Sequence, residues 1–252
     1  DKQPFCIFGR QNIITAFKAG KRFDKILLLK SWKGEEAAAI QKLAFQTDTP
    51  VQNVPKEKLE AVAKKYLQYQ GASHEGAIGF LSIINYYTID DVLHSVYAKG
   101  QTPLFIVLDG ITDVGNFGAI ARSAECMGVH ALIMPAQGSA QINTEAMKAS
   151  AGSLKHVLVC REKNLLAAIN YLKTNGIRIY GTEMRESSEI TKADFTVPCA
   201  IVMGSEGDGI SKEILKACDE RVRIPMTGKT ESLNVSVSTG IVLYEALRQR
   251  GK

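Results

Sequence analysis

The chain has little of what marks a membrane protein, a disulfide-bonded protein or a metalloprotein. Its 252 residues include 5 cysteines, 4 histidines and 7 prolines. The cysteines form no C-x-x-C pair, and no Cys/His spacing fits a zinc site. No apolar run approaches the roughly 20 residues that a bilayer crossing needs, and no charged start leads into an apolar signal segment. We therefore expect a globular cytoplasmic protein with free thiols, no bound metal and no membrane contact.

Basic residues are concentrated near the start of the chain. Up to residue 90 there are 13 Lys and Arg against 9 Asp and Glu, whereas the later residues carry 18 and 17. The densest basic stretch contains one acidic residue, Asp24, among Lys18, Lys21, Arg22, Lys25, Lys30 and Lys33. Such a stretch would attract a phosphate backbone. A solvated turn between a helix and a strand would have the same composition, so both interpretations stay open.

The hydrophobic pattern indicates two α/β domains. Residues 1–85 alternate helix-like stretches with short apolar runs, which predicts a small α/β unit. Residues 86–103 are partly helical in pattern and end in Gly-Gln-Thr-Pro, which is typical of a linker. Residues 104–252 contain continuous apolar runs of the kind found in strands buried on both faces. They predict a parallel sheet covered by helices, whose carboxyl edge is the place to look for a ligand site.

The first candidate segment, residues 109–122, leaves a strand, turns through glycines and enters a helix. Asn116 is a favourable N-cap for that helix, which would place Arg122 in its second turn. Taken alone, Arg122 fits an ordinary surface position at least as well as a functional one.

The second segment, residues 201–211, is an apolar strand followed by a loop with three glycines. Glycines let main-chain N–H groups approach a ligand closely. The loop matches neither the Walker pattern nor G-x-G-x-x-G, so a phosphate cradle is disfavoured. Glu206 would bind a hydroxyl or an amine, or it would cap the following helix.

The third segment, residues 223–245, contains Ser232 and Asn234, two residues that favour a helix start, before an apolar helix. Gly228-Lys229-Thr230 lacks the upstream glycine of a nucleotide loop. The apolar face of the helix is core by default and is equally suited to a contact between subunits.

Taken together, these segments resemble the three motifs of the SpoU/TrmH family of RNA ribose 2′-O-methyltransferases, in the SPOUT superfamily. The matching residues are 116–122, 203–211 and 224–238, and the resemblance covers residues 104–252. Further upstream, residues 7–10, 24–29 and 73–79 resemble the L30e-like domain of the subgroup that methylates 23S ribosomal RNA. In two places the chain departs from the family pattern. It has Asp113-Val-Gly-Asn116 where Asp-Pro-x-Asn is common, and Glu75 and Gly79 where Gln and Ala are common.

The resemblance implies an α/β fold in which a C-terminal parallel-sheet SPOUT domain is tied in a deep trefoil knot. A small L30e-like α/β domain would precede it, and the chain would form a homodimer. The methyl donor would be S-adenosylmethionine, and the substrate would be the ribose of a guanosine in 23S ribosomal RNA. The implied donor-binding residues are Gly204, Ile224, Leu233, Thr182, Met226 and Ser232. The implied RNA-binding residues are Arg10, Lys21, Arg22 and Lys25.

The resemblance assigns the reaction itself to four residues, Asn116, Arg122, Glu206 and Asn234. A free guanidinium has a pKa above about 12, so Arg122 is a poor base. We expect it to orient an RNA phosphate and to stabilise developing charge, while a phosphate oxygen or Glu206 takes the proton. Asn116 and Asn234 would hold the active-site loops, although both would also serve as plain helix caps.

Three alternatives remain open at this point. One is a transfer RNA methyltransferase of the same family. Another is an RNA-binding protein that keeps the fold without the chemistry. The third is a Rossmann-type dehydrogenase, suggested by fold class alone and disfavoured because the dinucleotide fingerprint is missing.

Overall fold

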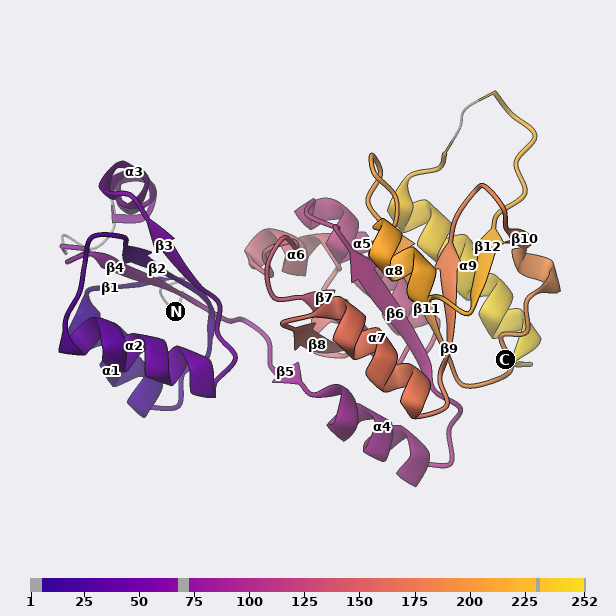
Figure 1. Ribbon diagram of the computed structural model, residues 1–252, viewed down its shortest axis with the longest axis horizontal. Coiled ribbons are helices and arrows are strands. Elements are labelled where there is room, and N and C mark those ends of the chain that lie inside the picture. The colour runs from indigo at the N-terminus through magenta and orange to yellow at the C-terminus, as the bar shows by residue number, and fades with distance from the viewer. Residues whose placement is uncertain (1–5, 68–72, 230–231, 252) are drawn as a thin grey trace. The chain divides into compact units, whose positions relative to one another are not determined.

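The computed structural model describes residues 6–67, 73–229 and 232–251 and divides the chain into two compact units. The first unit ends at Ile83 and the second begins at Ile84. Each unit builds its own β-sheet (Figure 1). Within the described residues, no helix has the length and apolar character needed to cross a membrane.

The first unit is a four-stranded mixed sheet in the order β1-β4-β2-β3. Its strands are β1 (Cys6–Phe8), β2 (Phe23–Leu29), β3 (Val51–Val54) and β4 (Ala77–Leu81), and its helices are α1 (Arg10–Lys18), α2 (Glu35–Gln46) and α3 (Lys56–Leu67). Successive side chains of β2 point to opposite faces of the sheet. Ile26 and Leu28 therefore pack with α1 and α2, while Leu27 packs with Leu59 of α3.

The second unit is an eight-stranded sheet in the order β10-β12-β9-β11-β6-β7-β8-β5, and all its pairings are parallel. The strands are β5 (Tyr86–Tyr87), β6 (Leu104–Asp109), β7 (Ala131–Pro135), β8 (Leu158–Glu162), β9 (Arg178–Thr182), β10 (Ser188–Glu189), β11 (Cys199–Gly204) and β12 (Glu220–Arg223). The helices are α4 (Ile89–Ala98), α5 (Val114–Cys126), α6 (Thr144–Ala149), α7 (Leu165–Thr174), α8 (Lys212–Ala217) and α9 (Val235–Gln249), with short 3₁₀ turns η1 (Ser153–Lys155) and η2 (Ile190–Lys192). The parallel sheet predicted for this part of the chain is confirmed.

Helices cover both faces of this sheet, and that explains its apolar strands. In Figure 1, α7 and α8 lie in front of the sheet, whereas α5 and α9 lie behind it. The two central strands, β6 and β11, pair residue for residue, from Leu104 with Cys199 to Asp109 with Gly204. From Leu104 to Leu108 and from Cys199 to Met203 every side chain is buried. A strand with solvent on neither face has no reason to alternate polar and apolar residues.

The prediction that residues 86–103 form a linker is wrong. Tyr86 and Tyr87 form β5, which pairs with β8 at the edge of the sheet. The following helix α4 begins at the N-cap Thr88 and buries four residues in the core of the second unit, namely Ile89, Val92, Leu93 and Val96. Their spacing is that of one helix face, so the segment folds onto the sheet because it can bury that face.

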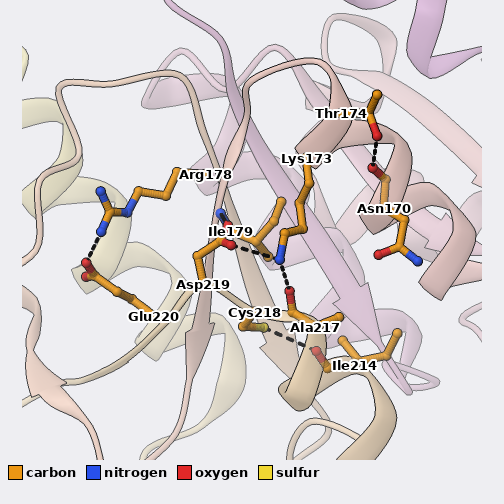
Figure 2. Close-up of polar contacts among 10 residues, drawn as sticks. All are labelled: Asn170, Lys173, Thr174, Arg178, Ile179, Ile214, Ala217, Cys218, Asp219 and Glu220. Atoms are coloured by element: carbon orange, nitrogen blue, oxygen red, sulfur yellow. Dashed lines mark hydrogen bonds and ion pairs between the residues drawn. The ribbon is translucent and has the colours of Figure 1, made fainter.

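Charged side chains fix the connection between α8 and β12 (Figure 2). Lys173 of α7 donates to the carbonyl of Ala217 at 2.9 Å and forms an ion pair with Asp219 at 2.8 Å. Asp219 also accepts from the main-chain N–H of Ile179 at 2.8 Å, which ties the connection to β9. Arg178 and Glu220 pair across the starts of β9 and β12. These contacts set the position of β12, and the end of β12 contributes to the pocket described next.

Candidate active site

A pocket lies at the carboxyl ends of β9, β11 and β12. It encloses about 660 Å³ of space, including its open mouth. Its walls come from four segments, namely the end of β9 with the residues after it (182–184), the end of β11 with its loop (203–209), the end of β12 with the residues after it (222–226), and the entry and first turns of α9 (232–242). The carboxyl edge of the parallel sheet is where the sequence predicts a ligand site.

Gly204 is where the loop after β11 turns back on its own strand. Ser205 and Gly209 exchange main-chain hydrogen bonds of 3.1 and 3.0 Å, which closes the loop. A Cβ atom at Gly204 would overlap the main chain of Gly209 and Ile210. Backbone cannot move aside as a flexible side chain can, so this position requires glycine. The pocket consequently has a wall of main chain rather than of side chains.

The structure brings the six predicted donor-binding residues together around this pocket. Thr182, Gly204, Ile224, Met226, Ser232 and Leu233 all line it. Glu183 and Arg223 also line it, although sequence reasoning assigned neither of them to the donor. The available signal was their position, because each is adjacent to a residue that the resemblance assigned to the donor.

Three side chains that are distant in the sequence meet in one hydrogen-bonded cluster. Asn116 donates from Nδ2 to Oε1 of Glu206 at 3.1 Å. Asn234 donates from Nδ2 to the same Glu206 oxygen and to Oδ1 of Asn116, the latter at 3.0 Å. One carboxylate oxygen thus receives two amide N–H groups, which fix the position of the carboxylate. Glu206 also lines the pocket, so the cluster adjoins it.

Asn234 both begins α9 and belongs to this cluster. Its Oδ1 accepts from the main-chain N–H of Ser236 at 2.9 Å and from the Ser236 hydroxyl at 2.6 Å. The capping bonds therefore decide which way the amide points, and they leave the Nδ2 hydrogens for Glu206 and Asn116. Of the two helix starters predicted in this segment, Asn234 is the cap.

The prediction that Asn116 caps its helix is wrong. Helix α5 begins at Val114, and the cap is Asp113, whose Oδ1 accepts the main-chain N–H of Asn116 at 2.7 Å. Because Asp113 takes the capping position, the side chain of Asn116 is available to Glu206. The earlier start also moves Arg122 from the second turn to the third.

Arg122 does not join the cluster. Its side chain is exposed, and it forms no hydrogen bond or ion pair with the residues that the structure describes. It lies six residues after Asn116, which on a helix is about 9 Å along the axis and a third of a turn around it. The structure thus groups three of the four predicted catalytic residues and leaves Arg122 free to contact something outside the chain.

In the first unit, Arg10 is occupied by contacts within the chain. Its Nε donates to the carbonyl of Glu75 at 2.5 Å, and its Nη1 pairs with Glu36 at 3.3 Å. Its guanidinium lies 4.5 Å from the ring centre of Trp32. The bond to Glu75 joins two of the three upstream segments that resemble the L30e-like domain, residues 7–10 and 73–79, so Arg10 positions these two against each other.

The other predicted RNA-binding residues differ in exposure. Lys21 and Arg22 are exposed in the turn between α1 and β2. Lys25 is half-buried, with its ammonium 5.0 Å from the ring centre of Phe80, and burial lowers the pKa of that ammonium. Lys21 and Arg22 are thus the better placed of the three to meet a phosphate.

The cysteines of the chain are mostly buried, and no metal-ligand cluster is found among the residues that the structure describes. That part of the chain contains no group of three or more His, Cys, Asp and Glu side chains that could hold a metal ion. Burial raises the pKa of four thiols, to about 12 for Cys160 and to about 11 for Cys6, Cys199 and Cys218. A thiol with so high a pKa is protonated at neutral pH and is a poor nucleophile.

A parallel sheet with a main-chain-walled pocket at its carboxyl edge, next to an Asn-Glu-Asn cluster, defines a class of ligand-binding α/β proteins. Comparison with known families identifies the class more closely. Residues 103–244 match the SpoU rRNA Methylase family, and residues 6–72 match the family described as RNA 2′-O ribose methyltransferase substrate binding. The chain belongs to the SpoU family of RNA methyltransferases.

Two bacterial relatives match almost the whole chain. A Bacillus subtilis (strain 168) protein named for the TrmH family of tRNA/rRNA methyltransferases is 30% identical over 244 residues, 97% of this chain and 95% of its own. A Staphylococcus epidermidis protein of the same description is 35% identical over 248 residues, 98% of this chain and 97% of its own.

Solved structures show the same fold. The TrmH/SpoU tRNA modifying enzyme of A. aeolicus is 38% identical and covers 60% of this chain and 77% of its own, with a TM-score of 0.56. The SpoU methyltransferase AviRb from Streptomyces viridochromogenes, crystallised with the cofactor AdoMet, covers 98% of this chain and 90% of its own. Its TM-score is 0.61 and its sequence identity is 23%, so the two proteins are alike in fold.

Proposed function

We propose that this protein transfers a methyl group from S-adenosylmethionine to the 2′-hydroxyl of a ribose, that of a guanosine in 23S ribosomal RNA. One observation carries the proposal: six residues assigned to the donor line one pocket, and the Asn116–Glu206–Asn234 cluster adjoins that pocket. The donor would lie in the pocket, and the ribose would reach it past the cluster.

The pocket residues fit S-adenosylmethionine. Ile224, Met226 and Leu233 offer apolar surface to a purine, and the main chain around Gly204 offers hydrogen-bonding groups without side-chain bulk. Glu183 and Arg223 add charge to the same wall. When bound, the donor supplies a methyl group already activated by a positive sulfonium.

The protein's part in the reaction is to position the ribose hydroxyl and to take its proton. Positioning is worth several orders of magnitude when the reacting atoms are held in line. Glu206 is held by two amide donors and would receive the proton, alone or together with an RNA phosphate. Arg122, exposed and unbonded within the described chain, would orient that phosphate and stabilise charge on the oxygen.

Replacing Arg122 tests this assignment. We expect Arg122→Ala to lower methyl transfer by about 10²–10³-fold, the size of a lost transition-state contact. Donor affinity, measured by calorimetry, should stay within about twofold, because the side chain does not line the pocket. Turnover at the wild-type rate would remove Arg122 from the mechanism.

The first unit supports ribosomal over transfer RNA as the substrate. It matches a substrate-binding family that is separate from the methylase family. The A. aeolicus tRNA modifying enzyme, by contrast, covers only 60% of this chain. A transfer RNA substrate is the second candidate, because the curated relatives carry the joint description tRNA/rRNA.

A homodimer and a trefoil knot in the second unit are part of the same proposal. Val237 and Tyr244 are 50% and 60% exposed on α9, and their spacing places them on one face of that helix. A second copy of the chain would cover this face. Light scattering on the purified protein would distinguish a dimer from a monomer.

Cytoplasmic location stays a prediction that fractionation of cells would check.

The substrate is tested by incubating the protein with radiolabelled S-adenosylmethionine and separate pools of unmodified ribosomal and transfer RNA. We expect label in 23S RNA, mapped to one ribose by primer extension at low nucleotide concentration. Label in transfer RNA alone would establish the second candidate. Donor binding without label in either pool would indicate an RNA-binding protein that does not catalyse.

A further inference from the structure

Two side chains of opposite charge line the donor pocket on neighbouring strands. Glu183 directly follows β9, and Arg223 is the last residue of β12. Thr182 pairs with Val222 in the parallel ladder, and the N–H of Glu183 donates to the carbonyl of Val222 at 2.9 Å. Glu183 and Arg223 therefore occupy adjacent positions at the pocket wall.

These two side chains bond to other groups rather than to each other. Oε1 of Glu183 accepts from the N–H groups of Met184 and Arg185, at 2.7 and 3.2 Å. Arg223 donates to the carbonyl of Ser187 and lies 3.9 Å from Glu189. A carboxylate has about four acceptor sites and a guanidinium has five N–H donors. Within the described residues, each side chain thus keeps unused hydrogen-bonding capacity at the pocket.

A ligand with an ammonium and a carboxylate close together would use both charges. The methionine part of S-adenosylmethionine is such a group, since both charges sit on one carbon. We propose that Glu183 binds the ammonium and Arg223 binds the carboxylate of the donor's amino-acid end. This inference rests on the proposed function, because it assumes that donor. A planar guanidinium suits a carboxylate especially well, since it offers paired N–H groups.

Arg223 also holds the loop that follows β9, and this second role has to be separated from the first. Arg221, two residues earlier on β12, holds the same loop through Glu186 at 3.3 Å. It does not line the pocket. Arg221→Ala is therefore a matched control, which loosens the loop without removing a charge from the pocket.

Two ligands separate recognition of the amino-acid end from recognition of the nucleoside. S-adenosylhomocysteine carries the zwitterion, whereas 5′-methylthioadenosine has the same adenosine and sulfur without it. By calorimetry we expect Arg223→Ala and Glu183→Gln each to weaken S-adenosylhomocysteine binding about tenfold, a typical loss for one partly exposed charged contact. Binding of 5′-methylthioadenosine should stay within about twofold in both variants, which also shows that the pocket is folded.

The controls decide between the possible outcomes. Arg221→Ala should bind both ligands as the wild type does, and Arg223→Lys should recover part of the lost affinity. Equal losses for both ligands, or no loss for either, would overturn the assignment of the amino-acid end. A wild-type protein that binds neither ligand would instead overturn the proposed donor.

Discussion

At the scale of single residues, the candidate site is held together by side chains that each form hydrogen bonds with two different groups. Asn234 accepts its capping bonds at Oδ1 and donates its cluster bonds from Nδ2, so the start of α9 and the Asn-Glu-Asn cluster share one amide group. Glu206 accepts from both asparagines. Under the proposed function, a substitution here would act on stability and on methyl transfer together, and an experiment has to measure both.

Asn234→Ala should lower the free energy of unfolding by about 1 kcal/mol, the usual cost of a lost N-cap. It should lower methyl transfer by about 10²-fold or more, because Glu206 loses a donor that orients it. The matched control is Asn164→Ala, which removes the N-cap of α7, an asparagine bonded to the N–H of Ala167 at 2.9 Å. Denaturant unfolding and single-turnover methylation measure the two effects. If Asn164→Ala reduced turnover as much, the loss would reflect capping alone.

At the scale of elements, the packing of α5 against α6 depends on one glycine. A Cβ at Gly118 would meet the Cβ of Ala149, and it would lie 2.9 Å from the carbonyl oxygen of Ala146 and 3.0 Å from the nitrogen of Ser150. The two helices approach so closely because no side chain separates them. Since α5 carries both Asn116 and Arg122, this contact also fixes where the site's first segment lies.

Gly118→Ala should destabilise the protein by about 1–3 kcal/mol, because the helices must separate to admit a methyl group. Gly240→Ala is the control, since a Cβ there meets only the Ser123 hydroxyl at 3.9 Å. In α9 the added methyl should instead stabilise by about 0.5–1 kcal/mol through helix propensity. Urea unfolding of both variants gives the comparison, and a stable Gly118→Ala protein would contradict the close packing.

The end of α9 carries an ionic contact that makes stability depend on pH. Hydrogen bonds from Arg248 and then from Gln249 lower the pKa of Glu245 from 4.5 to about 2. Gln249 also bonds to the carbonyl of Ala193 at 3.0 Å, so this group ties α9 to the residues after η2. The folded state thus prefers the ionised carboxylate more strongly than the unfolded chain does.

A lowered carboxyl pKa adds stability above about pH 4.5, and that stability is lost as the pH falls toward about 2. Glu245→Gln should therefore reduce stability at pH 6 and flatten its decline between pH 5 and pH 3. Thermal unfolding across this range measures the slope. The exposed Glu213→Gln serves as the control, and an unchanged slope in Glu245→Gln would show that the carboxyl group is not held as described.

At the scale of the whole molecule, the proposed function would divide the work between the two units, the first holding RNA and the second carrying the reaction. The basic excess lies in the first unit, where Lys21 and Arg22 are exposed. The pocket and the Asn-Glu-Asn cluster lie entirely within the second. Binding by phosphate contacts weakens as salt rises, so the salt dependence of RNA binding measures how many phosphates the protein contacts.

Neutralising Lys21 and Arg22 together should weaken binding to 23S RNA and reduce the salt slope by about 1–2, one unit for each lost phosphate contact. Fluorescence titration at several salt concentrations measures this slope. A double variant at Lys99 and Lys192, two exposed lysines of the second unit, controls for the general loss of charge. An unchanged slope would return Lys21 and Arg22 to the role of solvated surface residues.

Local chemistry was enough to predict much of this protein. Continuous apolar runs such as 104–108 and 199–203 predicted buried parallel strands, because such strands have no solvent face. Asparagine at 234 was predicted to matter because few residue types favour a helix start, and glycine at 204 because glycine lets the main chain approach a ligand closely. Motif order then pointed to the family, which the comparisons show.

Contacts between distant residues were decided only by the tertiary structure. The sequence cannot state that Asn116 and Asn234 meet at Glu206, that α4 packs on the sheet, or that Arg10 is occupied by Glu36 and Glu75. Each outcome depends on which surfaces meet, and a burial or hydrogen bond between residues far apart in the chain has no local signal. The sequence by itself determined the strands, the loops and the types of side chain at the site. Only folding decided which of those side chains bond to one another, because that choice is made by competition among all the partners that come within reach.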